Sequence, residues 1–240
     1  MASITFDALD DFNKSVEELN ILVKAASGYK LLKRPEKQSL MLRSTVLFLG
    51  THLECFFESI AEEYLFKIEQ LHLPRAIIPE RLLMGAVQYH FDENLVAKIN
   101  KKSLKCRDTL VKLAQIVSCE SPVTELKIDT GFRYGKHGAN EVQNLFSRLD
   151  IDAVFENCTV YIEKESMLSE GPEKEKVDVK AKFNTLTSIR NALIHQYTMP
   201  DEDVINNVIG DIELYKHFAE RLAQLLSKKI ESLEEQNKAA

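Results

Sequence analysis

The 240-residue sequence lacks the short motifs that mark several enzyme classes. It has no G-x-S-x-G nucleophile turn, no H-E-x-x-H helix and no cysteine/histidine cluster with zinc spacing. Its glycines fit neither a P-loop nor a dinucleotide-binding fingerprint. Most histidines are scattered without ligand spacing, namely His52, His72, His90, His137 and His217. We therefore expect neither a metal ion nor another cofactor.

Cysteine pairs, long apolar runs and a secretory signal are also missing. No two of the four cysteines form a C-x-x-C pair, which predicts reduced, mostly buried thiols rather than a disulfide framework; they are Cys55, Cys106, Cys119 and Cys158. We find no apolar run of the roughly 20 residues that span a bilayer. The N-terminus, MASITFDALDDF, is acidic and amphipathic, unlike a secretory signal. The expected location is the cytoplasm.

Positive charge is in short supply, because the net charge is −6. Proteins that bind nucleic acids usually have a basic surface, since neutralising phosphates supplies much of their affinity. The charge balance argues against a non-specific nucleic-acid coat but leaves a small basic site open. With 45% hydrophobic and 28% charged residues, the composition is that of a soluble globular protein with a core.

Apolar residues recur at helical spacing through most of the chain, which predicts an all-α bundle forming one domain over residues 1–240. The first 35 residues hold an N-terminal helix that ends at Gly28. The other predicted helices cover residues 37–71, 80–87, 94–117, a stretch that Asn140 caps, 150–158, 177–197 and 201–235. Residues 159–162 suggest a brief strand. Irregular loops are expected at residues 123–140 and at the charged, mobile stretch 163–176.

Residues 186–197, LTSIRNALIHQY, combine an apolar helical pattern with polar residues in unusual places. At about 100° per residue, one broad apolar face is formed by Phe183, Leu186, Ile189, Leu193, Ile194 and Tyr197. Arg190 falls inside this face, while Asn191 and His195, four residues apart, are neighbours at its polar edge. Because a buried guanidinium needs an anion, we expect beside Arg190 either a carboxylate of the chain or a phosphate of a ligand.

Glu54 is one candidate for that anion. It lies at the border of the apolar face of the long helix over residues 37–71, beside Gly50 and Ala61. Most glutamates are exposed, so one interpretation is a solvated residue at the edge of the helix. The other makes Glu54 the partner that holds Arg190 when no substrate is bound.

Two basic segments offer further candidates for binding phosphate. One is the predicted helix with Lys98, Lys101, Lys102, Lys105, Arg107 and Lys112, which is either a solvated face or the flank of an RNA cleft. The other is the loop that carries Arg133, Lys136 and His137 between glycines, before a helix N-terminus. That loop is either a mobile surface loop or a phosphate site.

Arg190-Asn191-x-x-x-His195 resembles the R-(polar)-x3–5-H signature of HEPN domains, and it stands on the penultimate helix, where those domains carry it. Tyr197 extends the resemblance to the R-x4-H-x-Y form of HepT-like toxins. Residues 43–65, with the pair Leu53-Glu54, resemble the early long helix of the RiboL-PSP-like branch. Residues 138–151 are similar to a middle helix of that branch. Together these similarities cover residues 43–226.

An arginine, a polar residue and a histidine are what RNA cleavage without a metal needs. A histidine, whose ordinary pKa is about 6.5, can exchange protons with the ribose 2′-hydroxyl or the leaving 5′-oxygen, and an arginine can stabilise the phosphate. The resemblance implies an endoribonuclease, acting as a toxin or defence effector, whose dimer sets two motifs face to face. In HepT-like toxins the motif tyrosine, here Tyr197, is modified by a nucleotidyltransferase-type antitoxin.

Two alternatives without catalysis stay open beside this hypothesis. In the first, Arg190 is salt-bridged in the core and His195 simply ends a helix. In the second, the chain is a non-catalytic HEPN module that dimerises and binds a nucleotide or a protein partner. The retained Arg190 and His195 favour the enzyme, whereas the acidic balance favours the module.

Overall fold

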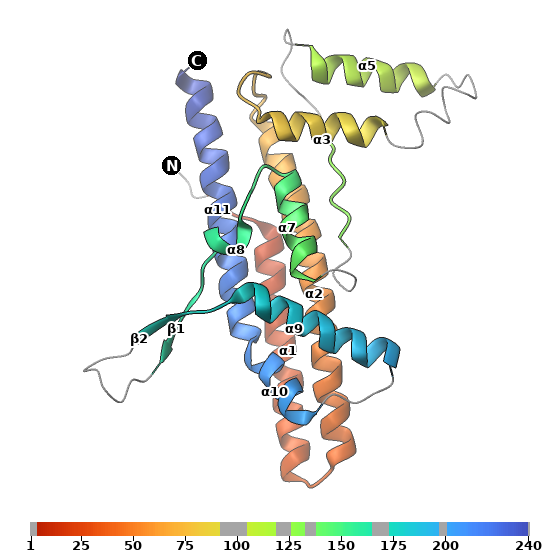
Figure 1. Ribbon diagram of the computed structural model, residues 1–240, viewed down its shortest axis with the longest axis vertical. Coiled ribbons are helices and arrows are strands. Elements are labelled where there is room, and N and C mark those ends of the chain that lie inside the picture. The colour runs from red at the N-terminus through yellow and green to blue at the C-terminus, as the bar shows by residue number, and fades with distance from the viewer. Residues whose placement is uncertain are drawn as a thin grey trace.

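The chain folds as an all-α bundle with one small hairpin, as the apolar periodicity predicts. The computed structural model describes residues 4–91, 105–118, 126–132, 138–164, 173–196 and 201–239. Figure 1 shows α1 (Asp7–Leu31), α2 (Pro35–Gln70) and α11 (Ile212–Ala239) packed side by side along the long axis, and α9 (Val179–Asn191) running across them.

The first two helices form an antiparallel pair joined by a tight reversal. The predicted stop at Gly28 is wrong, because α1 continues to Leu31. The chain reverses instead at Lys33, whose φ of 56° is in the left-handed region, and Pro35 then begins α2. Proline suits this first position because its missing N–H would have no helical partner there.

The apolar face of α2 is the centre of the core. Val46, Leu49, Leu53, Phe57 and Ile60 recur at intervals of three and four and are 0% exposed. By length and composition alone, α2 could cross a membrane, because an 18-residue window of it has a mean hydropathy of 1.2. In this fold its buried apolar residues line the inside of the bundle.

The middle of the chain adds short elements around one end and one side of α2. Helices α3 (Glu80–Phe91) and α5 (Lys105–Val117) lie at the end of the bundle where α2 finishes, as Figure 1 shows. Residues 126–132 follow without regular secondary structure, and α7 (Ala139–Arg148) and α8 (Val154–Asn157) pack beside α9 and each other.

The predicted cap of α7 is wrong, and a more distant residue takes its place. The helix begins two residues earlier than expected, with Gly138 at the N-cap position and a φ of 55°. A side chain at Gly138 would come within 2.9 Å of Asn184 of α9. Asn184 Oδ1 accepts the N–H of Ala139 at 3.1 Å, so the amide that satisfies this helix end comes from another helix.

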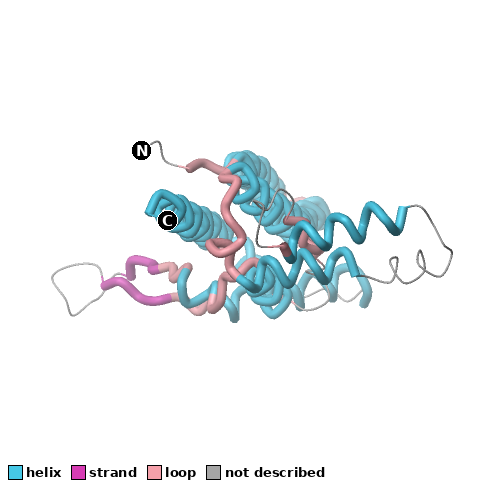
Figure 2. Tube along the Cα trace, turned by 90° about the horizontal axis from the view of Figure 1, so that it is seen from above, coloured by secondary structure: helices cyan, strands magenta, loops and turns pink. Residues whose placement is uncertain are grey.

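The two ends of the charged stretch before α9 form strands, in contrast to the predicted loop. Strands β1 (Tyr161–Lys164) and β2 (Glu173–Lys176) pair antiparallel, with Tyr161 opposite Lys176. Figure 2 shows this hairpin projecting from the body of the bundle. The strand predicted at residues 159–162 is real but lies two residues later.

The last predicted helix is in fact two. Helix α10 (Glu202–Gly210) is followed by Asp211 at its C-cap, and α11 then runs to Ala239, beyond the predicted end at residue 235. Glycine is a poor helix former, and Asp211 Oδ1 pairs with Lys182 Nζ of α9 at 2.9 Å. This tertiary contact holds the break at a place where the apolar spacing itself continues.

Tilted and edge-to-face aromatic contacts fix α9 to the rest of the core. Phe183 of α9 lies 5.7 Å from Phe57 of α2, 5.3 Å from Phe218 and 4.9 Å from Tyr215, both of α11. Aromatic pairs at such separations stabilise a core beyond their burial alone. The helix that carries the motif is therefore anchored near its first half, upstream of Arg190.

The cysteines are only partly as predicted. Cys158 is buried and Cys55 is exposed, and both are free thiols. Burial raises the pKa of the Cys158 thiol to about 12. Cys106 and Cys119 lie outside the side chains that the structure describes.

Candidate active site around Arg190

An ion pair joins the motif helix to α2. Arg190 Nη2 donates to Glu54 Oε2 at 3.0 Å, across 136 residues of sequence. The side chains of Arg190 and Glu54 are 15% and 22% exposed, so the pair lies at the edge of the core. The hypothesis that Glu54 is the anionic partner of Arg190 is confirmed as a contact, and its role in a reaction stays a prediction.

Gly50 makes this ion pair sterically feasible. A Cβ at Gly50 would lie 2.6 Å from Arg190 Cδ and 3.0 Å from its Nε, far inside van der Waals contact. The aliphatic part of Arg190 therefore lies over the bare backbone at Gly50 and reaches Glu54 one helical turn further along α2. The sequence places Gly50 beside Glu54, but no pattern in it reveals this close approach of Arg190.

The guanidinium is not fully satisfied by this contact. Arg190 Nε is buried and has no hydrogen-bond partner in the part of the chain that the structure describes. A buried N–H without an acceptor is unfavourable. Besides the bond from its Nη2 to Glu54, Arg190 thus has a donor, Nε, that an acceptor on a ligand could satisfy.

The backbone widens immediately after Arg190. Residues Ala192–Gln196 form a π-helix, η1, instead of continuing the α-helix that the sequence predicts. Such wide turns occur often at functional sites. Five residues on an α-helix advance about 140° beyond a full turn, which would turn His195 away from Arg190. A π-helix turns less per residue than an α-helix, so the rotation that separates His195 from Arg190 is smaller than in a continuous α-helix.

The far end of the motif lies at the surface. His195 is exposed, and Asn191 is partly buried. Within the predicted apolar face, Ile194 is 41% exposed, while Leu193 packs against the core. Tyr197 lies outside the described residues. The motif therefore runs from an anchored arginine to an accessible histidine.

A row of carboxylates on α2 leads from Glu54 along the bundle. Glu58 Oε1 accepts the N–H of Phe132 at 2.8 Å, and Glu62 Oε1 accepts the hydroxyl of Thr130 at 3.3 Å. Further along, Glu69 accepts the N–H of Leu126. These acceptors hold residues 126–132 against α2, so most of this acidic row binds the chain itself.

The basic loop begins and ends close to this row and to α9. Arg133, Lys136 and His137 lie outside the described residues, so their predicted role in binding phosphate stays a prediction. Phe132, which precedes them, is bonded to Glu58, one turn from Glu54. Gly138, which follows them, contacts Asn184 and Thr187 of α9.

The basic helix is only partly described. Its N-terminal lysines, Lys98, Lys101 and Lys102, lie outside the described residues, as do the side chains of Lys105 and Lys112. Arg107 is exposed. The choice between a solvated face and the flank of an RNA cleft therefore stays open.

The matched family covers every part of this arrangement. A comparison with family models matches residues 10–232 to the family described as RiboL-PSP-HEPN. Searches of curated proteins and of solved structures found no match. Gly50, Glu54, Arg190 and His195 all fall inside the matched span.

Proposed function

The chain belongs to the RiboL-PSP-HEPN family, and on that premise we propose that it is a metal-independent endoribonuclease that cleaves RNA at Arg190 and His195. The observation that carries the proposal is the state of Arg190. Its guanidinium is held in place by Glu54 and keeps a buried Nε donor without an acceptor. A phosphate oxygen is an acceptor that suits such a guanidinium.

The proposed reaction is an attack of the ribose 2′-oxygen on the neighbouring phosphorus. The new bond joins O2′ to phosphorus, the bond to O5′ breaks, and the products carry a 2′,3′-cyclic phosphate and a 5′-hydroxyl. Within the dimer proposed below, one His195 takes the proton from the 2′-hydroxyl and the other gives a proton to the leaving 5′-oxygen. Arg190 stabilises the negative charge that builds on the phosphate oxygens.

Neighbouring residues prepare and complete this site in the proposal. Glu54 orients Arg190 until substrate arrives, and the phosphate then takes over one of its donors. Asn191, at the end of α9, contacts the same phosphate or the ribose. Arg133, Lys136 and His137 bind the RNA backbone, in keeping with the anchoring of the flanking residues beside α2 and α9.

A homodimer would complete the site. Two copies that pair around the accessible end of the motif would bring together two arginines and two histidines, and would concentrate positive charge in one cleft despite the net charge of −6. Ile194, 41% exposed beside His195, supplies apolar surface for such a contact.

Such an enzyme would act as a toxin or a defence effector in the cytoplasm, because unrestrained RNA cleavage harms the cell that makes it. A partner that restrains it is then expected. A nucleotidyltransferase-type antitoxin that modifies Tyr197 is one form of that partner, following the HepT-like pattern of the motif.

A second function is favoured by the ion pair itself. Arg190 already has a carboxylate partner, so in this alternative the only role of the ion pair is to fix α9 on α2. The chain would then be a non-catalytic module that dimerises and binds a nucleotide or a protein. The two proposals differ in whether His195 is needed for any activity.

The test is RNA cleavage by the purified full chain, freed of any partner. We expect activity that persists in EDTA and leaves 2′,3′-cyclic phosphate ends. His195→Ala should lower the rate by about 100-fold or more while leaving thermal unfolding unchanged, because the side chain is exposed. Arg190→Lys should not restore the activity that Arg190→Ala loses, because an ammonium cannot replace the planar fork.

Sedimentation equilibrium supplies the second readout. A dimer at micromolar concentration is expected, and a monomer would contradict the two-copy site. Cleavage that is absent in the wild-type dimer, or equal in His195→Ala, would leave the binding module as the better account.

A further inference from the structure

A hollow lies away from Arg190, beside the C-terminal half of α7. It measures about 950 Å³ and is walled by α3, by α7 and by Ile128 and Asp129. This is the size of pockets that hold small organic ligands. The residues of α7 that line the hollow, Asn144, Ser147 and Arg148, belong to its C-terminal half, whereas its N-terminus is bonded to α9.

The α3 wall exposes large apolar side chains to the hollow. Met84, Tyr89 and Phe91 are 55%, 46% and 56% exposed. Exposed groups of this kind mark binding surfaces. Aromatic rings in particular provide flat faces on which nucleobases stack.

The α7 wall offers polar groups that could meet a ligand. Arg148 Nε is buried without a hydrogen-bond partner among the described residues. Its Nη1 is 3.6 Å from Asp129 Oδ2, beyond good hydrogen-bond distance, and Asp129 is itself 74% exposed. Arg148 is therefore only loosely paired with Asp129, and its guanidinium can donate hydrogen bonds to the anion of a ligand instead.

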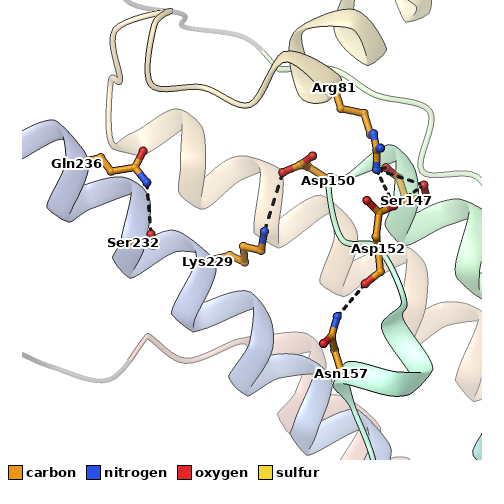
Figure 3. A network of polar contacts seen from close by, with 8 residues as sticks. All are labelled: Arg81, Ser147, Asp150, Asp152, Asn157, Lys229, Ser232 and Gln236. Carbon is orange, nitrogen blue, oxygen red and sulfur yellow. Dashed lines mark hydrogen bonds and ion pairs between the residues drawn. The ribbon is translucent and has the colours of Figure 1, made fainter.

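Arg81 brings a second guanidinium to the rim, from α3. Figure 3 shows it reaching toward Ser147 and Asp152, and its Nη1 donates to Asp152 Oδ1 at 2.6 Å. It also lies 3.4 Å from the Ser147 carbonyl oxygen. All of these bonds use Nη1, so the other donors of Arg81 are left for a ligand within the described part of the chain.

We propose that this hollow is a nucleotide-binding site, in which a base stacks on Phe91 and Tyr89 and its phosphate binds Arg148. Gln88 and Asn144 line the same hollow, and their amides can donate to and accept from the edge of a base. The ligand is either a free ribonucleotide or one nucleotide of a single-stranded RNA. The proposal needs no cleavage at Arg190.

Calorimetric titration tests binding in the full-length chain. The probes are the four ribonucleoside 5′-monophosphates, the matching nucleosides and a pentanucleotide with 2′-O-methyl groups, which cannot be cleaved by 2′-hydroxyl attack. We expect at least one monophosphate or the pentanucleotide to bind, with affinity weakened about tenfold or more by Phe91→Ala. Arg148→Ala should lower the affinity for phosphate-bearing ligands about tenfold but leave the affinity for nucleosides unchanged.

Arg221→Ala is the matched control, since it removes the same charge from an exposed position on α11, and binding should stay within about twofold of the wild type. If Arg148→Ala fails to fold, Arg148→Lys keeps the charge, loses the fork and should still weaken binding. Competition between pentanucleotide and monophosphate identifies an RNA subsite, and binding of the monophosphate alone identifies a free nucleotide. No binding at millimolar concentration, or binding insensitive to both Phe91→Ala and the Arg148 variants, overturns the proposal.

Discussion

Substituting Gly50 by alanine should destabilise the protein, although the same change elsewhere in a helix stabilises it. In a helix interior alanine is favoured over glycine by about 1 kcal/mol. At Gly50 the new Cβ would lie 2.6 Å from Arg190 Cδ, so Arg190 has to move. The partly buried bond to Glu54, 3.0 Å long, would be lost at a cost of about 2 kcal/mol, and residual crowding would add about 1 kcal/mol.

The net expectation for Gly50→Ala is a loss of about 2 kcal/mol in the free energy of unfolding, measured by urea denaturation. Gly28→Ala in α1 is the matched control, because nothing lies within 4 Å of a Cβ there. It should gain up to about 1 kcal/mol.

A double-mutant cycle isolates the contact. In an Arg190→Ala background the obstacle is gone, so Gly50→Ala should become stabilising by about 1 kcal/mol, which gives a coupling of about 3 kcal/mol. If Gly50→Ala has the same effect with and without Arg190, the close packing of Arg190 over Gly50 is wrong. Under the proposed function, Gly50→Ala should also slow RNA cleavage, because it displaces the phosphate-binding group.

Other expectations follow from particular contacts. Asn184→Ala should lower the free energy of unfolding by about 1 kcal/mol because the end of α7 loses its acceptor, and Asn184→Asp should largely restore it; equal losses in both would contradict the capping role. With the Cys158 pKa raised from 9.0 to about 12, the folded state keeps a proton that the unfolded chain releases, so its stability should fall as pH rises above about 9. Iodoacetamide at pH 8, followed by peptide mass spectrometry, should label Cys55 and spare Cys158. Reversing the charges of Arg133 and Lys136 should weaken RNA binding and flatten its salt dependence by about one unit of slope per lost phosphate contact; an unchanged slope would assign them to the solvated surface.

Periodicity in the sequence predicts the main helices because each buries a continuous apolar face. The start of α9 is also readable locally, since Asp178 accepts the N–H of Ala181 at 2.9 Å as a cap. The break between α10 and α11 cannot be predicted from the local sequence, because the apolar spacing continues through it. The stabilising partner of Asp211 is Lys182, on another helix.

The candidate site shows the same division. Arg190 on an apolar face signals the need for an anion, and the resemblance to HEPN domains points to Glu54. The role of Gly50 depends on how two helices cross, and no local pattern reports a contact between residues so far apart in the chain. The π-helix after Arg190 is likewise hidden, because ALIHQ is compatible with an ordinary α-helix.

The crossing at Gly50 also fixes the register of α9 along α2. Gly50 is the only glycine among the 36 residues of α2, so it is the only position where that helix presents no side chain. A slide of α9 by one turn, about 5.4 Å, would place the side chain of Val46 or of Glu54 beneath Arg190. The missing side chain at Gly50 leaves room for Arg190 at a single position along α2, and this fixes how the two helices align.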